Sequence, residues 1–473
     1  MAEIKFGTDG WRAIISDDFT FSNVKIVAQA IADYVNNEKE DVHRRKEIVI
    51  GYDTRFLSEK YARIVACVSA ANGIKVILSD RPSPTPSVSY AIKERGLRGG
   101  VMITASHNPP EYNGIKYKAY YAGSAGPDII GKIEKYLNKN PVREEALEKA
   151  ASSGAVKTEN IVARHLTFAK RFVDLKLLKK SRLKVITDSM YGTGNDYTAA
   201  LLSGGRARVT TIHNEKNPYF GGINPEPILP NLNELAAKTK KGKFDIGLAT
   251  DGDADRIGVT APNGKMLTGH KVIALLLLHL FEDRGLRGEV VQTICGTFLI
   301  NKICQKYNLK MHETPVGFKY ICDLMRKRDI LIGGEEAGGI SFKGYIPERD
   351  GILSGLLLLE MMAMRKKPLL KILKEIDKEY GTYEYRRIDI IYPNEKNGPL
   401  MERLKASPPG DILGKKVVEI KSYDGFKFIC EDSSWLILRF SGTEPKLRVY
   451  SEAATEKKAL EMLEFGKRLA YSV

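Results

Sequence analysis

The sequence has few cysteines, and they follow no shared pattern. Its 473 residues include five, namely Cys67, Cys295, Cys304, Cys322 and Cys430. Their number is odd, they lie far apart, and no two form a Cys-x-x-Cys pair. This spacing argues against a disulfide framework, and we expect reduced thiols buried in the core.

Long hydrophobic runs are also missing. The first ten residues contain no apolar signal segment, and the longest apolar stretches, at 272–281 and 356–364, are too short to cross a bilayer. No strict short repeat appears, which argues against a solenoid. We therefore expect a globular cytoplasmic protein with no membrane partner.

Acidic residues are outnumbered by basic ones. Lys and Arg total 74 against 58 Asp and Glu, a net charge of +16. Such a surplus suits nucleic acid, a membrane surface or a small anionic substrate. The basic clusters at 43–46, 179–184, 238–243 and 365–367 are short and scattered, and they lack interleaved aromatic residues. This pattern favours solvated surface, so we expect no nucleic-acid partner.

The order of apolar segments predicts an α/β fold. In residues 1–157 strands expected at 47–51, 75–78 and 100–103 alternate with helices at 58–71 and 87–95, which is typical of a largely parallel sheet. The polar stretch 138–157 is interpreted as a connector. The alternation restarts in 158–265 and again in 266–370, whereas 371–473 is rich in strands and predicts a smaller α+β domain. We expect three related α/β domains with mixed, mainly parallel sheets, followed by this fourth domain.

A serine-centred loop at 104–116 is the first chemical candidate. It follows the expected strand 100–103, and Pro109 and Pro110 disfavour a helix, so the Ser106 hydroxyl should project from a strand end. Thr104 and Asn108 occupy the glycine positions of a Gly-x-Ser-x-Gly elbow, which argues against a serine hydrolase. A capped turn without chemistry is the alternative interpretation.

Three aspartates follow the expected strand 245–249. Asp251, Asp253 and Asp255 alternate, so in an extended segment their carboxylates point the same way and can converge on a hard cation. Arg256 stands where an EF-hand needs glycine, and Asp255 stands where an Asp-x-Asp-x-Thr phosphatase needs threonine. A solvated turn is the alternative, but ending a buried strand with three carboxylates is costly without a ligand, which favours a metal site.

Two further loops suit a sugar and a phosphate. Residues 333–339 contain four glycines and Glu335, a combination that permits close approach and accepts hydrogen bonds from hydroxyls. Residues 439–448 contain Arg439, Ser441, Gly442 and Thr443, which can cradle a dianionic phosphate. Either loop could instead be a plain surface turn. Because α/β folds bind ligands at strand ends, the loops together predict a phosphosugar site.

In their order along the chain, these segments resemble the α-D-phosphohexomutase family. The similarity covers 6–12 (FGTDGWR), 51–55 (GYDTR), 104–116, 251–256, 335–339 and 439–448, and thus nearly the whole chain. The resemblance implies four domains around a central cleft. It also implies a small phosphosugar substrate, and it leaves the oligomeric state open.

The resemblance implies a mechanism as well. Ser106 would carry a phosphoryl group, and Mg²⁺ would be held by Asp251, Asp253, Asp255 and the phosphorylated Ser106, with a hexose 1,6-bisphosphate as primer. The other residues that it implies are Arg12, Glu335, Arg439, Ser441, Gly442 and Thr443 for substrate binding, Lys116, Lys319 and His107 as candidates for proton transfer, and Arg256 as a positive contact. The choice among the three proton-transfer candidates stays open.

The sugar loop departs from the family in two places. Ala337 stands where many members have serine, and Gly339 stands where mannose-active and glucosamine-active relatives often have histidine. Phe318 and Lys319 also differ from the histidine-containing loop of those relatives. The departures favour interconversion of glucose 1-phosphate and glucose 6-phosphate. The alternatives are a phosphomannomutase, a phosphoglucosamine mutase, or a catalytically silent sugar-phosphate-binding relative.

Overall fold

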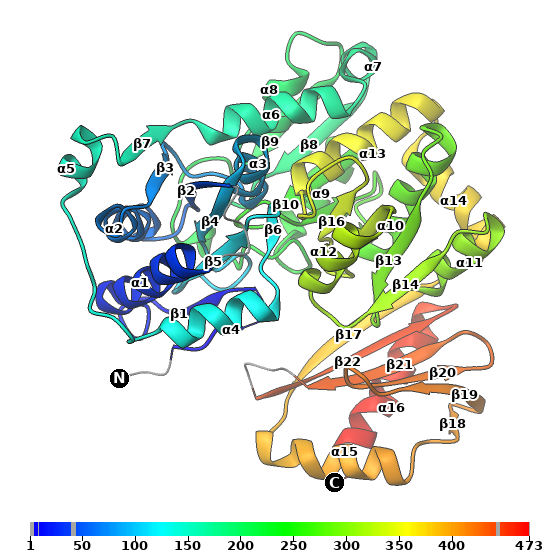
Figure 1. Cartoon of the computed structure of the whole chain (residues 1–473). Coiled ribbons are helices and arrows are strands. Elements are labelled where there is room, and N and C mark those ends of the chain that lie inside the picture. The colour runs from blue at the N-terminus through cyan, green and yellow to red at the C-terminus, as the bar shows by residue number, and fades with distance from the viewer. Residues whose placement is uncertain (1–3, 8, 39–43, 441–444, 473) are drawn as a thin grey trace. The chain divides into compact units, whose positions relative to one another are not determined.

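We describe the fold from a computed structural model of the chain, which describes residues 4–7, 9–38, 44–440 and 445–472 (Figure 1). The chain forms two compact units. The first comprises Met1–Gly288 and Gly317–Leu370, and the second comprises Glu289–Val316 and Lys371–Val473.

The first unit begins with a mixed sheet in the order β1-β5-β4-β2-β3-β7, with β6 paired to β5. Strands β4, β2, β3 and β7 are parallel, whereas β5 runs antiparallel to β4 and β1. The strands are β1 (Trp11–Ile14), β2 (Arg45–Tyr52), β3 (Lys75–Ser79), β4 (Leu97–Ile103), β5 (Tyr112–Ala119), β6 (Gly123–Ser124) and β7 (Val156–Glu159). The helices are α1 (Phe21–Asn37), α2 (Ser58–Ala71), α3 (Thr85–Arg95), α4 (Pro127–Tyr136) and α5 (Leu147–Ser152).

Two segments of this sheet differ from the sequence-based expectation. The stretch interpreted as a connector ends in β7, which pairs with β3. The second half of the serine-centred loop is strand β5, because its backbone is paired on both sides, with β1 and β4. Its lysines Lys116 and Lys118 concealed this strand, since they point into buried ion pairs rather than solvent. The loop that carries Ser106 is therefore confined to the residues between β4 and β5.

A second sheet in the first unit has the order β12-β11-β10-β8-β9. Its strands are β8 (Lys184–Asp188), β9 (Arg208–Ile212), β10 (Ile246–Thr250), β11 (Ile257–Thr260) and β12 (Met266–Leu267), and its helices are α6 (Ile161–Phe172), α7 (Leu175–Lys180), α8 (Tyr197–Leu202), η1 (Phe220–Gly222) and α9 (Asn233–Lys241). Strands β10 and β11 pair antiparallel from Thr250 and Ile257 outwards. Residues 251–256, the predicted metal segment, are thus the tight turn that joins these two strands.

The remainder of the first unit contains a second turn of this kind, which joins two antiparallel strands. Strands β15 (Ile330–Gly334) and β16 (Ile340–Phe342) pair antiparallel, so the predicted sugar loop 335–339 is again a turn between strands. The helices are α10 (Gly269–Leu278), its π-helical extension η2 (His279–Asp283), α12 (Phe318–Lys327) and α13 (Gly351–Arg365). The sequence did not predict α13, because it is buried nearly all round and lacks an amphipathic period. Asp350 begins it by accepting a hydrogen bond from the Leu353 N–H.

The second unit is built on an antiparallel sheet in the order β17-β22-β21-β20-β19-β18. Its elements are β13 (Glu289–Thr293), α11 (Phe298–Lys306), β14 (Met311–Thr314), α14 (Leu369–Tyr380), β17 (Glu384–Ile391), η3 (Asn394–Lys396), α15 (Asn397–Ala406), β18 (Asp411–Ile412), β19 (Lys415–Lys421), β20 (Phe426–Cys430), β21 (Trp435–Phe440), β22 (Lys446–Ala453) and α16 (Glu456–Tyr471). The strand-rich C-terminal α+β domain is thus confirmed.

Strand β21 shows how this sheet is buried on both faces. Its residues alternate, as strand geometry requires, so that Leu436 and Leu438 join a core that includes residues of α15 and α16. Trp435 and Ile437 point the other way, into a cluster with Ile294 and Cys295. The segment 289–316 therefore covers the face of the C-terminal sheet opposite to α16.

Two expectations from composition were also tested. All five cysteines are unpaired and buried, which confirms the expected reduced core thiols. Within the described ranges, no helix combines the length and the apolar character that a membrane span requires.

Candidate active site

Ser106 lies just beyond the end of β4 and is fully buried. Its Oγ donates a hydrogen bond to Asp251 Oδ2 over 2.9 Å, and its N–H donates to Thr104 Oγ1 over 2.8 Å. Its backbone has φ = +53°, a left-handed conformation that non-glycine residues seldom adopt. Strain of this kind persists where the surroundings impose it, so the contacts of the loop matter for the placement of the hydroxyl.

Arg55 imposes the shape of this loop. Its guanidinium donates to four backbone carbonyls over 2.6–3.0 Å, those of Ser106, Asn108, Pro109 and Tyr112. Asp53 holds the guanidinium through Nε at 3.1 Å and also accepts the Thr104 hydroxyl at 2.6 Å. The sequence alone does not indicate this role for residues 51–55, because nothing local shows that an arginine will bind carbonyls about fifty residues away.

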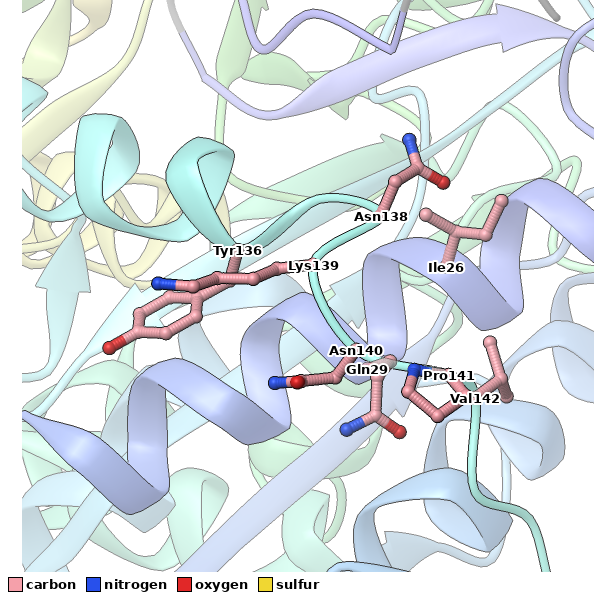
Figure 2. A pocket seen from close by; sticks show the side chains of 8 residues that line it. All are labelled: Ile26, Gln29, Tyr136, Asn138, Lys139, Asn140, Pro141 and Val142. Carbon is pink, nitrogen blue, oxygen red and sulfur yellow. The ribbon is translucent and has the colours of Figure 1, made fainter.

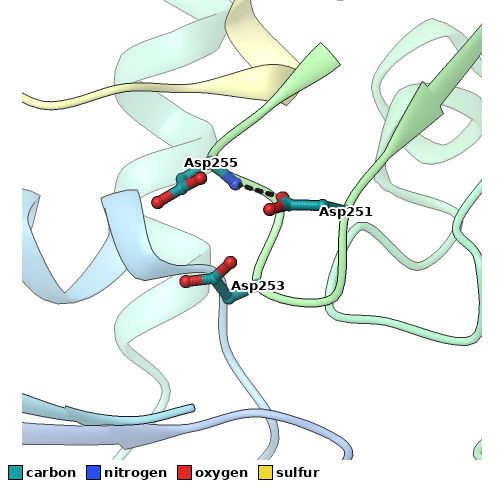
Figure 3. A group of neighbouring side chains, drawn as sticks. All are labelled: Asp251, Asp253 and Asp255. Atoms are coloured by element: carbon teal, nitrogen blue, oxygen red, sulfur yellow. Dashed lines mark hydrogen bonds between the residues drawn. The ribbon is translucent and has the colours of Figure 1, made fainter. Parts of the chain in front are cut away.

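The three aspartates of the β10–β11 turn converge, as Figure 3 shows. All are fully buried, and each offers a carboxylate oxygen within 4.8 Å of the others. Asp251 Oδ1 accepts the backbone N–H groups of Asp255 and Arg256 at 3.0 and 3.1 Å, which fixes the turn. Since Asp251 Oδ2 also meets the Ser106 hydroxyl, the predicted proximity of the serine and the carboxylates is present.

The pattern of occupied and bare oxygens fits a cation. Asp253 Oδ2 accepts from Lys116 at 2.8 Å and from Thr85 at 2.6 Å, while Asp255 Oδ2 accepts from Arg349 at 2.5 Å. Oδ1 of Asp253 and Oδ1 of Asp255 are buried and have no hydrogen-bond partner among the described residues. Bare buried carboxylate oxygens are costly unless something binds them, and oxygen ligands are what hard divalent cations prefer. The three aspartates can therefore hold a metal ion.

Electrostatics agree with this interpretation. Burial raises the pKa of Asp251 well above its ordinary value, and the charges of Asp255 and Asp253 add to the effect. Burial alone would lower the pKa of Lys116, but the carboxylates of Asp253, Asp9 and Asp255 outweigh it and raise that pKa. Lys116 is thus held as an ammonium ion, and the raised pKa of Asp251 reflects burial and repulsion among the three carboxylates, which a bound cation would relieve.

Arg349, between β16 and α13, joins the metal turn to the sugar loop. Its guanidinium reaches Asp9 Oδ2 at 2.7 Å, Asp255 Oδ2 at 2.5 Å and Glu335 Oε2 at 3.2 Å. The side chain lies over Gly339, where an added Cβ would approach Arg349 Cδ to 2.3 Å. This arginine was not predicted from the sequence. The signal available was the charged run Glu348-Arg349-Asp350 directly before an apolar helix.

Three other predicted residues lie around the Ser106 loop. Arg12 Nη1 donates to Asn108 Oδ1 at 2.7 Å, and Arg256 Nε lies 3.8 Å from Asp251 Oδ2. Burial, followed by the charges of Arg256 and Arg12, lowers the pKa of His107 well below its ordinary value, so its imidazole is neutral. Its buried Nδ1 has no hydrogen-bond partner within the ranges that the structure describes.

Lys319 and Glu335 differ in how firmly they are held. Glu335 is buried and paired with Arg349, and burial raises its pKa. Lys319 lies at the start of α12, where burial lowers its pKa and its ammonium is 5.3 Å from the Tyr320 ring centroid. Within the part of the chain that the structure describes, no hydrogen bond joins Lys319 to Ser106 or to the three aspartates.

The predicted phosphate segment belongs to the second unit. Arg439, at the end of β21, donates from Nε to Asp424 Oδ1 at 2.9 Å. Ser441, Gly442 and Thr443 lie outside the described residues.

A separate surface hollow does not compete with this site. It lies in the first unit between α1 and the segment after α4, with a volume of about 420 Å³ (Figure 2). Its lining residues Gln29 and Asn140 already bond to Asp33, and Lys139 lies over the Tyr136 ring. The hollow therefore presents satisfied polar groups and no cluster of titratable side chains.

Comparison with known proteins matches four consecutive domains. The chain matches phosphoglucomutase/phosphomannomutase alpha/beta/alpha domain I over residues 3–144, domain II over 163–264, domain III over 268–380 and the C-terminal domain over 395–465. These matches confirm the predicted arrangement of three α/β domains and a C-terminal domain.

Relatives cover the chain from end to end. It is 30% identical to a phosphoglucomutase/phosphomannomutase of Thermococcus kodakarensis, over 98% of both chains. It is 28% identical to a phosphoglucosamine/phosphogalactosamine mutase of Sulfurisphaera tokodaii, also over 98% of both. The crystal structure of a phosphomannomutase-type protein from Thermus thermophilus superposes with a TM-score of 0.87, with 33% identity and 99% coverage of both chains.

A more distant structure shares the fold. N-acetylphosphoglucosamine mutase of Aspergillus fumigatus, in complex with GlcNAc-6P and magnesium, superposes with a TM-score of 0.57 at 15% identity, covering 99% of this chain and 95% of its own. The four matched domains define a multi-domain α/β enzyme. The chain belongs to the phosphoglucomutase/phosphomannomutase family, and it is a phosphohexomutase, an isomerase.

Proposed function

We propose that the protein interconverts hexose 1-phosphate and hexose 6-phosphate, with glucose as the preferred sugar, through a phosphoserine at Ser106 and a hexose bisphosphate intermediate. The observation that carries the proposal is the 2.9 Å hydrogen bond from Ser106 Oγ to Asp251, one of three converging buried carboxylates. A silent sugar-phosphate binder would not need this arrangement, and none of the predicted catalytic groups is replaced in the sequence.

The residues around Ser106 have distinct proposed tasks. Asp251, Asp253 and Asp255 would hold Mg²⁺, which neutralises charge on the transferring phosphoryl group. The backbone clamp of Arg55 keeps the serine oxygen in place, and Lys116 keeps two carboxylates oriented through its ammonium. These groups are fixed before substrate arrives, which is how electrostatic stabilisation of a transition state becomes large.

Proton transfer is proposed for one of three groups. Because burial lowers the pKa of His107 and of Lys319, these two favour accepting the proton of the substrate hydroxyl. Lys116, whose pKa is raised, favours a purely electrostatic role. Replacing each in turn and recording the rate against pH tests this, since loss of the true acceptor removes one limb of the profile.

Substrate recognition is proposed for two loops. Glu335, held by Arg349, would accept hydrogen bonds from sugar hydroxyls. Arg439 with Ser441, Gly442 and Thr443 would bind the phosphate that is not being transferred, in both orientations of the sugar. After the first transfer the bisphosphate must turn end for end and then rephosphorylate Ser106 from its other position.

One assay tests the function and the preferred sugar together. The purified protein is given the monophosphates of glucose, mannose, glucosamine and N-acetylglucosamine, each with a trace of the matching bisphosphate as primer. We expect the highest kcat/KM for glucose phosphate, because Gly339 replaces the histidine of other specificities. Mannose and glucosamine are the alternatives, since the chain's relatives carry those substrate names. Absence of turnover with all four would refute the proposal.

A further inference from the structure

Asp424 occupies an unusual position in the second unit. It lies in the turn between β19 and β20, and its two carboxylate oxygens serve different segments. Oδ1 accepts the Nε–H of Arg439 at 2.9 Å, and Oδ2 accepts the backbone N–H of Val316 at 2.7 Å. Val316 is 108 residues away along the chain and precedes Lys319 by three positions. One carboxylate thus ties the arginine of the phosphate segment to the backbone at the end of the segment 289–316.

The hydrogen bond between Arg439 and Asp424 uses only one of the guanidinium nitrogens. Nε is engaged, whereas no hydrogen bond within the described ranges occupies Nη1 or Nη2. The two terminal nitrogens form the fork that binds a phosphate through paired hydrogen bonds. The side chains of Arg439 and Asp424 are only 14% and 19% exposed, so solvent screens their ion pair little. Asp424 therefore fixes the direction of the fork without competing for it.

The turn that carries Asp424 is itself fixed to the segment 289–316. Lys427 Nζ donates to the Ile294 carbonyl at 2.6 Å. Glu313 accepts from Lys421 at 2.9 Å and from Tyr423 at 2.6 Å. These contacts attach the residues before and after the turn to the segment 289–316, and the apolar cluster around Trp435 adds to them. Asp424 consequently has a rigid base from which to orient Arg439.

We propose that Asp424 is a positioning residue for phosphate recognition: it aims the Arg439 fork and fixes it relative to the backbone at Val316. The proposal rests on the proposed function, in which Arg439 anchors the substrate phosphate. An anchor held in advance loses less side-chain freedom when the dianion binds, which favours affinity. The negative charge of Asp424 also repels a dianion. If its removal raises KM, the positioning of Arg439 is the larger effect; if its removal lowers KM, the repulsion is larger.

The test is Asp424→Asn, which preserves size and one acceptor oxygen but removes the charge and one of the two bonds. We expect KM for the hexose monophosphate to rise by about three- to tenfold, with kcat changed by less than about twofold, because orientation of the anchor affects binding rather than transfer. Glu431→Gln is the matched control, since it removes one exposed carboxylate from the turn after β20 in the same unit. An unchanged or lower KM in Asp424→Asn overturns the proposal.

A double-mutant cycle separates positioning from a general structural effect. In Arg439→Lys, which has no Nε–H, Asp424→Asn should raise KM no further. An equal rise in both backgrounds would show that Asp424 acts elsewhere and would overturn the proposal. The dissociation constant of glucose 6-phosphate, measured by calorimetry, gives the same comparison without turnover. If the wild-type protein binds the sugar phosphate but isomerises none, the proposed function fails while the cycle still decides the role of Asp424; if nothing binds, both fail.

Discussion

The surroundings of Ser106 and of Arg439 differ in how charge is held. Around Ser106, Asp251, Asp253 and Asp255 have no exposed surface, and Lys116 and Arg349 each contact more than one carboxylate. Arg439 has one carboxylate partner among the described residues and is partly exposed. The proposed reaction at Ser106 breaks and forms a bond, which requires atoms that are fixed in advance. Arg439, as the proposed phosphate anchor, must bind the substrate in two orientations and release it between them.

This contrast predicts how the two regions respond to mutation. Removing one member of a buried charge network leaves its partners uncompensated, so effects in the first unit should be large. Arg439 has a single carboxylate partner among the described residues, so fewer charges are left uncompensated there, and effects near Arg439 should be smaller and appear mainly in KM.

The largest effect is expected for Ser106→Ala. Without the hydroxyl there is no acceptor for the phosphoryl group, and kcat/KM should fall by at least about 10³-fold. The thermal unfolding midpoint should change little, since the clamp of Arg55 acts on the backbone. Ser203→Ala, at an exposed helix end, is the control. A variant that keeps most of its turnover would refute the covalent route.

The second largest effect is expected for removal of divalent metal. Treatment with a chelator should lower the rate by at least about 100-fold, and added Mg²⁺ should restore it. Binding independent of turnover should also be visible, because a ligand that prefers the folded state raises the unfolding midpoint. Asp253→Asn should lose this Mg²⁺-dependent shift, while Asp245→Asn, outside the turn, should retain it. A rate unaffected by chelation would show that the three carboxylates serve another purpose.

The sequence predicted those site residues whose environment can be inferred from their neighbours in the chain. Ser106 and the three aspartates lie in short segments between apolar strands, so their pattern shows their environment. Arg55, Arg349 and Thr85 could not be found in this way, because the contacts that place them at the site are distant in the sequence: 51 residues separate Arg55 from Ser106, 94 separate Arg349 from Asp255, and 168 separate Thr85 from Asp253. Arg55 and Thr85 look like ordinary surface residues in the sequence, and the one local sign of Arg349 is the charged run before the apolar segment of α13.

The secondary structure was likewise predicted only in part. Helix α2 has the expected bounds, since its amphipathic period ends at a glycine two residues on. Strand β5 and helix α13 were missed for opposite reasons. The lysines of β5 point into buried ion pairs and look exposed in the sequence, and α13 is so thoroughly buried that its apolar residues show no period.

An intermediate effect is expected for Arg55→Lys. One ammonium cannot span four carbonyl groups, so the loop should relax from the left-handed conformation at Ser106. We expect kcat to fall by about ten- to a hundredfold while KM changes much less, since a misplaced nucleophile affects transfer more than binding. Arg63→Lys, on the exposed face of α2, is the control. Equal changes in kcat and KM would assign Arg55 to substrate binding instead.

The smallest effect concerns Glu452, the buried carboxylate of the second unit. Burial raises its pKa to about 6, although the Thr297 hydroxyl, the Phe298 N–H, the Lys427 charge and the Trp435 Nε1–H all favour the ionised form. Because the folded pKa exceeds the unfolded value, the folded state binds the proton more tightly. The second unit should therefore gain stability as pH falls from above 6 towards 4.5, by about 1 to 2 kcal/mol.

Glu452→Gln removes this titration while keeping an oxygen for the Phe298 and Trp435 donors. Its stability relative to wild type should therefore be about 1 to 2 kcal/mol more favourable at pH 7.5 than at pH 4.5. Trp435 fluorescence during urea unfolding, in a Trp11→Phe background, reports the second unit alone, since the chain has two tryptophans. A pH-independent difference between the two proteins would mean that Glu452 is already compensated. The contrast between the two regions would then be confined to Arg439.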